Sequence, residues 1–307
     1  MFKWFKSLFL IGIASSLVAC SSDDSDPNIV EVAQNDARFS VLVEAVVAAD
    51  LTTTLTGTGP FTVFAPTNDA FALLLTELGM TKAQLLADKA LLKAVLTYHV
   101  LPAQVMKKDV PAGKAIATVQ GGVFKVDAVG SDLVITDGRN RTSKIILTDI
   151  AASNGVIHAI DKVILPANKN IVETAAAVAD FSILVEAVTA ANLGATLSGT
   201  GPFTVFAPTN AAFASLLGEL GVTKDQLLAN KPLLTQVLTY HVVAGRVLKA
   251  DVPVGTAIKT VQGETFTVDS GLSITDQRAR KAKITGTDVM SSNGVIHVID
   301  KVILPKP

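Results

Sequence analysis

The spacing of apolar residues changes along each of two similar stretches of this chain. In the first stretch they recur every three or four positions over 39–47, which predicts an amphipathic helix. A Gly-Pro turn at 57–60 precedes residues 61–65, an aromatic and β-branched run that predicts a short strand. Residues 66–78 then predict a helix that Thr67 or Asn68 can cap. Two more helices are predicted over 83–86 and 89–97.

The second half of the stretch has the composition of strands. Apolar and β-branched residues form five short runs separated by Gly, Asp and Asn. The runs are 115–119, 123–129, 133–136, 144–148 and 155–164. Asn154-Gly155 predicts a tight turn before the last run, because this dipeptide favours positive φ. Helices followed by strands predict an α+β fold.

The whole pattern occurs twice along the chain. GTGPFTVFAPTNDAFA at 57–72 returns at 199–214 with fifteen of sixteen positions identical, and VLTYHV at 95–100 returns unchanged at 237–242. SNGVIHAID at 153–161 returns as SNGVIHVID, with three residues lost between the strand-like runs before it. The loss predicts a hairpin loop there. A period near 140 residues exceeds the 20–50 of solenoid repeats, so this is a duplicated domain.

The duplication sets the domain boundaries at 27–166 and 167–307. Only residues 167–170 separate Pro166 from the next helix-like run. We therefore expect restricted motion between the domains.

The N-terminus has the pattern of an export signal. Residues 1–19 combine two lysines with an apolar run too short to span a bilayer, which needs about 20 helical residues. LVAC at 17–20 resembles the lipobox of bacterial lipoproteins, which implies cleavage before Cys20 and lipid on its thiol; the alternative is a plain cleavage site beside a chance cysteine. Residues 20–26 then form the lipidated cysteine and an acidic tether, either a surface-export signal or a soluble linker.

Composition excludes several classes of protein. Apolar residues make up 49% of the chain, so it is no disordered tail. The 26 basic and 27 acidic residues argue against a dedicated nucleic-acid binder. One cysteine permits neither an intramolecular disulfide nor a cysteine-rich zinc site.

Three motifs carry a family resemblance. TVFAPTNDAF, YHV and NGVIHAIDKVILP occur in this order in the first stretch and, in matching form, in the second. Together they resemble the fasciclin domain family over residues 28–305. The resemblance implies two tandem domains, each a twisted β-sandwich or wedge flanked by helices. It also implies an extracellular role in adhesion and matrix contact.

The histidines and tyrosines all belong to the repeat. The family associates the Tyr-His pair with adhesion, and the matching residues are Tyr98, His99, Tyr240 and His241. Their apolar neighbours suggest burial and a structural role instead. His99 and His158 could meet as metal ligands, or each could be a buried imidazole tied by hydrogen bonds; we expect no metal and no cofactor.

Each copy also has a basic loop before a long strand. The cations are Arg139, Arg141 and Lys144 in the first copy, and Arg278, Arg280, Lys281 and Lys283 in the second. They form either a solvated edge that resists strand pairing or an anion-binding patch for sulfated or acidic polysaccharide.

No catalytic motif remains: Gly-x-Ser-x-Gly, His-Glu-x-x-His and Walker-type loops are missing from the sequence. We expect a non-enzymatic lipoprotein, anchored through Cys20 to the outer membrane of a bacterial envelope and exposed at the surface. Its expected partners are proteins or polysaccharides of cell surface, matrix or biofilm, and not nucleic acid. The alternative is a carbohydrate- or small-ligand-binding envelope lipoprotein, although Trp4 lies in the signal and leaves no tryptophan for sugar stacking.

Overall fold

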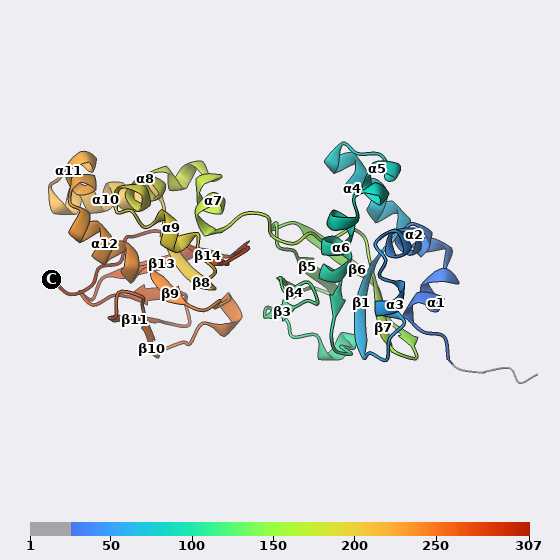
Figure 1. Cartoon of the computed structure of the whole chain (residues 1–307). Coiled ribbons are helices and arrows are strands. Elements are labelled where there is room, and N and C mark those ends of the chain that lie inside the picture. Colours follow the sequence, from blue (N-terminus) through green and yellow to red (C-terminus); the bar gives the residue numbers. More distant parts are fainter. Residues whose placement is uncertain (1–25) are drawn as a thin grey trace, which may run out of the picture.

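A computed structural model describes residues 26–307 as two similar units joined by one short connection (Figure 1). The signal segment, Cys20 and nearly all of the acidic tether lie outside the described residues. In this part of the chain, no helix combines the length and the apolar content needed to cross a membrane.

Each unit contains one seven-stranded sheet. In the first unit the strand order is β2-β1-β7-β6-β5-β4-β3, and only β1 and β7 run parallel. Its strands are β1 (Phe61–Pro66), β2 (Val100–Leu101), β3 (Ala115–Ala117), β4 (Val123–Val129), β5 (Asp132–Thr136), β6 (Thr142–Ala152) and β7 (Gly155–Ile160). The second unit repeats this order with β8 (Phe203–Pro208), β9 (Val242–Ala244), β10 (Ala257–Lys259), β11 (Thr265–Val268), β12 (Ser273–Thr275), β13 (Lys281–Ser291) and β14 (Gly294–Ile299).

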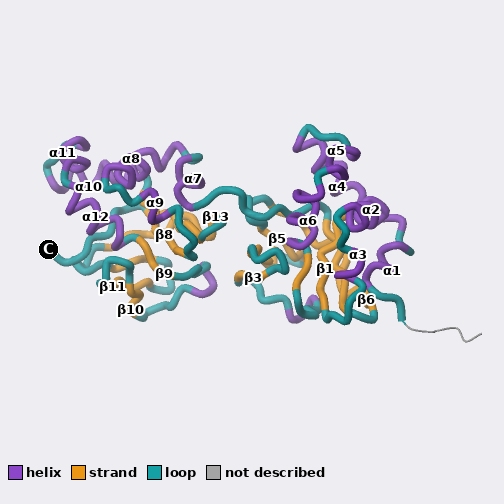
Figure 2. Tube along the Cα trace, viewed as in Figure 1, coloured by secondary structure: helices purple, strands orange, loops and turns teal. Residues whose placement is uncertain are grey.

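The helices of each unit gather on one side of its sheet (Figure 2). The first unit has α1 (Ile29–Gln34), α2 (Ser40–Ala48), α3 (Thr52–Leu55), α4 (Asn68–Leu78), α5 (Lys82–Ala87) and α6 (Lys89–Tyr98). The second has α7 (Ile171–Ala176), α8 (Ser182–Ala190), α9 (Gly194–Leu197), α10 (Asn210–Leu220), α11 (Lys224–Ala229) and α12 (Lys231–Tyr240). This content confirms the predicted α+β class.

Local signals explain the ends of α4. The Thr67 hydroxyl accepts from the Ala70 amide at 3.3 Å and satisfies one of the free donors of the first turn. Gly79 ends the helix at φ 63°, a left-handed conformation that suits glycine. Thr209 and Gly221 cap α10 in the same way. The helix predicted over 66–78 is therefore confirmed, with Thr67 as its cap.

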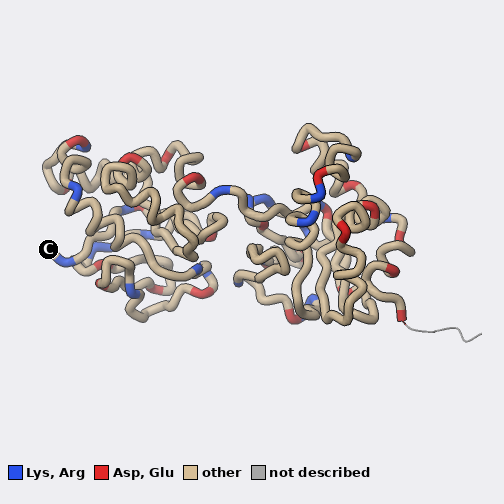
Figure 3. The backbone as a smooth tube through the Cα atoms, in the orientation of Figure 1, with Lys and Arg blue, Asp and Glu red and all other residues tan. Residues whose placement is uncertain are grey.

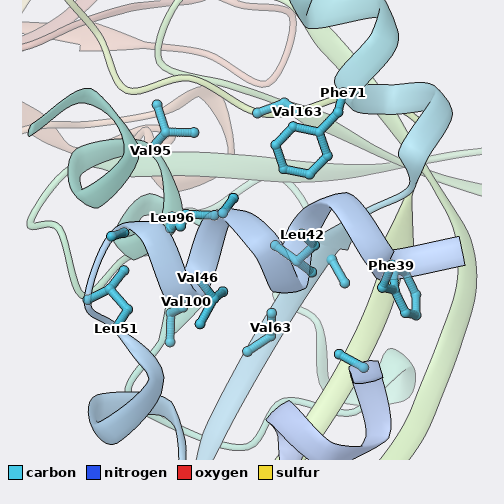
Figure 4. Close-up of a cluster of buried hydrophobic side chains, with 14 of the residues drawn as sticks. Phe39, Leu42, Val46, Leu51, Val63, Phe71, Val95, Leu96, Val100 and Val163 are labelled. Carbon is cyan, nitrogen blue, oxygen red and sulfur yellow. The ribbon is translucent and has the colours of Figure 1, made fainter. Parts of the chain in front are cut away.

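Strand β1 separates two apolar cores. Val63 and Ala65 face the helices and join a cluster that includes Phe71 and Leu96 (Figure 4). Phe64 points to the other side, into a cluster enclosed by the curled sheet itself. Because successive side chains of a strand point to opposite faces of the sheet, β1 contributes residues to the core on each side. Burial of each such side chain contributes about 1.5–3 kcal/mol.

Two local predictions need correction. Strand β6 runs from Thr142 to Ala152 rather than over 144–148, and β7 ends at Ile160 rather than at 164. The tight turn consists of Ser153 and Asn154, while Gly155 is already paired in β7. Gly155 has φ of 158°, which L side chains rarely adopt, and a Cβ on it would lie 2.1 Å from the Phe61 carbonyl oxygen; its backbone conformation and its close approach to β1 both require glycine.

Candidate functional site

His99 lies directly after α6 and ties three segments together. Its Nε2 accepts a hydrogen bond from the Ile164 amide at 3.1 Å, so the proton sits on Nδ1, which donates to the Val95 carbonyl at 2.7 Å. The ring is 1% exposed. Burial lowers the pKa of His99 to about 4, so the imidazole is neutral at pH 7. His241 has the same bonds, to Val237 and Ile303, and the same low pKa of about 4.

Tyr98 is also enclosed. Its hydroxyl donates to the Val123 carbonyl at 2.6 Å, and its ring meets Phe124 edge-on at 5.9 Å. Burial raises the pKa of Tyr98, and the same holds for Tyr240, which donates to Thr265. A partner could touch these four rings only after the domain opened. Their part in adhesion, implied by the resemblance, stays a prediction.

His158 forms hydrogen bonds to other segments than His99 does. Its Nδ1 accepts from the Asp149 amide at 3.1 Å, and its Nε2 donates to the Val105 carbonyl at 2.8 Å. All four ring nitrogens of the two histidines are therefore occupied by main-chain groups, which leaves no lone pair for a shared metal. Within residues 26–307, no group of three or more His, Cys, Asp or Glu side chains is placed to hold a metal ion.

The basic loop of the first unit is built around a buried carboxylate. Asp137 accepts from the amides of Arg139, Arg141 and Leu165 at 2.9 Å each. The guanidinium of Arg141 bonds to Asp137 at 3.0 Å and to Glu77 at 2.6 Å. These arginines therefore hold the loop against α4 and the end of the domain.

The second basic loop has the same construction around Asp276. Arg280 pairs with Glu219 at 2.7 Å, and the Nε of Arg278 donates to the Pro305 carbonyl at 2.8 Å. Lys144 in the first loop pairs with Asp132 at 2.9 Å, whereas Lys281 and Lys283 are exposed. Figure 3 shows charged positions distributed over both units. Binding of polyanions at these loops stays a prediction, and the exposed lysines are its best-placed groups.

Sequence reasoning missed the role of Asn154, which it assigned only to a turn. The side-chain oxygen accepts from the Ile29 amide at 2.9 Å, and the side-chain nitrogen donates to the carbonyls of Leu55 and Gly57 at 2.8 Å each. Asn293 makes the same three bonds in the second unit. The available signal was the identical SNG tripeptide in both copies.

A second missed feature is the junction between the units. Lys125 of β4 reaches Asp288 of the second unit at 2.9 Å and Asp127 of its own unit at 3.1 Å. The side-chain amide of Asn140 bonds to both main-chain groups of Met290, accepting from N–H at 2.5 Å and donating to C=O at 3.1 Å. These contacts fix β13 of the second unit against the first.

The junction residues differ between the copies. Thr267 stands where the first unit has Lys125, and Ala279 stands where it has Asn140. Met290 is buried, whereas its counterpart Ala151 is exposed. Each unit therefore has its own set of side chains on the surface that contacts the other unit. These differences between two otherwise similar copies were the signal in the sequence for this interface.

Two clefts accompany these features. The larger, about 480 Å³, lies beside α4; of its charged groups, Arg141 pairs with both Glu77 and Asp137, whereas Lys162 is exposed. The second, about 310 Å³, lies at the junction and is lined by both units. Its lining residues are Gln120, Gly121, Gly122, Val123, Pro166, Ala167, Arg246, Ser291 and Ser292.

Comparison with known proteins gives consistent results. The chain is 45% identical over 157 residues to protein sll1483 of Synechocystis sp., a match covering 50% of this chain and 81% of that protein. It is 31% identical over 251 residues to pig transforming growth factor-beta-induced protein ig-h3, and 27% identical over 288 residues to human periostin. These two matches cover 81% and 92% of this chain, but only 35% and 32% of those proteins.

A solved FAS1 domain pair from the insect cell adhesion molecule Fasciclin I matches 87% of this chain and 97% of its own, with 20% identity and a TM-score of 0.44. The model of the fasciclin domain matches residues 37–166 and again residues 179–305. The chain therefore belongs to the fasciclin domain family and contains two of its domains in tandem.

Proposed function

We propose that this chain is a non-enzymatic, surface-anchored lipoprotein whose two fasciclin domains mediate cell adhesion or contact with extracellular matrix or biofilm. The observation that carries the proposal is the family match of both halves. The lipobox-like LVAC at 17–20 supports an anchor on Cys20 at the outer membrane. Lipid chains on this residue would contribute about 0.8 kcal/mol per buried methylene.

The placement of the chemically versatile side chains supports a non-enzymatic role. The four histidines and the two tyrosines hold main-chain groups inside the domains. General acid-base catalysis needs a group that can reach the proton of a substrate. Buried and fully bonded imidazoles do not offer this.

The tandem arrangement supports adhesion through avidity. Each domain has its own apolar cores, so each can present a complete surface. When one domain is bound, the short connection holds the other at a high effective concentration near the same partner surface. Weak single contacts, in the micromolar to millimolar range, then suffice.

Adhesion of coated beads tests this proposal. Beads carrying residues 27–307 should adhere to cells or to matrix better than beads carrying 27–166 at equal density. Equal adhesion would contradict bivalency, and adhesion by neither, combined with turnover of a substrate, would contradict the functional class. Fractionation of a Cys20→Ala variant tests the anchor separately: unchanged retention in the membrane would place the anchor elsewhere.

A further inference from the structure

The cleft at the junction has features that neither domain needs for folding. Arg246 enters it from the loop after β9, and Gln120 to Val123 form the wall on the side of the first unit. The cleft holds about 310 Å³, near the lower end of the range for small-molecule sites. It could therefore take a ligand of monosaccharide size.

Arg246 has no counter-charge. Across residues 26–307, no carboxylate lies within 4.0 Å of its guanidinium, and its one hydrogen bond is a long contact of 3.4 Å to the Ser292 carbonyl. The side chain is half-buried, and burial lowers the pKa of Arg246. A guanidinium partly removed from water without an acidic partner is a site for an anion, and its planar fork matches a carboxylate.

Ser291 provides a second, independent observation that points to a ligand in the cleft. This residue lines the cleft and is 1% exposed, and its hydroxyl has no hydrogen-bond partner among the groups that the structure describes. A buried hydroxyl without a partner costs about 1–3 kcal/mol. A ligand oxygen in the cleft would supply the missing bond.

The copies differ at five of the nine positions that line this cleft. Arg246 and Ser291 replace Gln104 and Ala152 of the first unit. On the opposite wall, Gly122 stands where the second unit has Glu264, so no carboxylate projects from that position. These three differences each add a group that binds an anion or leave out a negative charge, whereas Ala167 stands in place of Lys306 and leaves out a positive one, and Val123 stands in place of Thr265.

Tyr98 supports the wall of the first unit. Its hydroxyl holds the Val123 carbonyl, and its ring lies under Gly122, where a Cβ would come within 3.1 Å of the ring. The tyrosine of the Tyr-His motif thus supports this wall of the cleft without lining the cleft itself.

From these features we infer that the junction binds a small hydroxylated carboxylate, of the class of the uronic acids, with Arg246 on the carboxylate and Ser291 and Gln120 on hydroxyl groups. One guanidinium balances the single charge of a carboxylate, whereas a phosphate monoester carries about −1.5 to −2. The inference goes beyond adhesion and does not depend on it.

Titration with D-glucuronate tests the inference, using NMR or calorimetry on residues 21–307. We expect binding with a Kd of about 1 mM or tighter, and slower hydrogen exchange on both walls of the cleft, around Val123 and Arg246. Arg246→Gln, which installs the residue of the first copy, should weaken binding at least about tenfold, and Ser291→Ala several-fold. Arg38→Gln removes an exposed arginine outside the cleft and should leave binding unchanged.

Four results would overturn the inference. Glucuronate could fail to bind, or could bind equally to the parent and to a folded Arg246→Gln variant. D-glucose could bind as well as glucuronate, which would remove the role of the carboxylate. Inorganic phosphate could bind in the cleft as strongly as glucuronate, which would contradict the argument that the single charge of Arg246 selects a singly charged carboxylate. If Arg246→Gln does not fold, equal binding of glucuronate to the parent and to Ser291→Ala overturns the inference instead.

Discussion

Mild acid should destabilise both domains through their buried histidines. His99 and His241 have a pKa of about 4 in the folded chain, against about 6.5 in an unfolded one. Between these values the unfolded chain binds a proton that the folded chain does not. The stabilising contribution is therefore complete above about pH 6.5 and is lost progressively as the pH falls toward 4.

The size of the effect follows from this difference in pKa. From pH 7 to pH 5, each of the two histidines should remove about 2 kcal/mol from the free energy of unfolding of its own domain. Carboxylates contribute little over this interval because most titrate nearer pH 4. Against a typical stability of about 5–15 kcal/mol, the loss is large.

Urea unfolding at pH 7 and pH 5 measures this loss, with hydrogen exchange in α6 and α12 as a separate probe for each domain. In His99→Gln, the first domain should lose about 2 kcal/mol less than the parent over this interval. The second domain retains His241 and serves as the internal control.

Direct titration keeps the prediction testable if His99→Gln fails to fold. By NMR, the imidazole of His99 in the parent chain should stay neutral at pH 5. Protonation near pH 6.5, or an equal loss of stability in parent and variant, would refute the argument from burial.

Three further predictions concern single residues. Ala279→Gly should raise the free energy of unfolding of the second domain by about 1 kcal/mol, since Ala279 has φ of 57°; urea unfolding measures it, and a decrease would contradict the assigned strain. Asn154→Ala should cost the first domain about 3 kcal/mol in the same assay, because an amide and two carbonyls lose their partner. Asn140→Gly should speed hydrogen exchange of the Met290 amide with little change in either domain's melting, because glycine keeps the φ of 62° at this position without strain; unchanged exchange would show that the junction contact is absent in solution.

Elements with strong local signals could be predicted from the sequence. Helix α4 has a threonine cap, an apolar face and a terminal glycine, and β1 is a compact aromatic and β-branched run. Helix α3 could not, because four residues are too short to be stable alone, whereas α1 has a local signal in the capping box of Asn28 and Glu31. They depend on the bonds that Asn154 makes to Ile29 and Leu55, about 100 or more positions away in the chain.

In the candidate site, too, some features could be predicted from the sequence and others could not. The Tyr-His pairs were found because the motif is repeated, and their apolar neighbours correctly indicated burial. The basic loops were visible as charge runs, but their pairing with Glu77 and Glu219 depends on the packing of α4 and α10. The junction cleft needs two domains in a fixed arrangement, which periodicity and spacing do not encode.

The comparison between copies separates folding from specificity. Many of the residues that fill the cores and bond to main-chain groups are the same in both domains, as with His99 and His241, because both domains adopt the same fold. A shared fold does not by itself determine what each domain binds. The positions that differ and also face the other domain include Lys114, Lys125, Asn140, Met290, Arg246, Ser291 and Gly122, together with their counterparts. A tandem chain in which the domains acted only as independent, equivalent adhesive units would need no such asymmetry at their junction, so the junction is the place to look for the activity that two domains have and one does not.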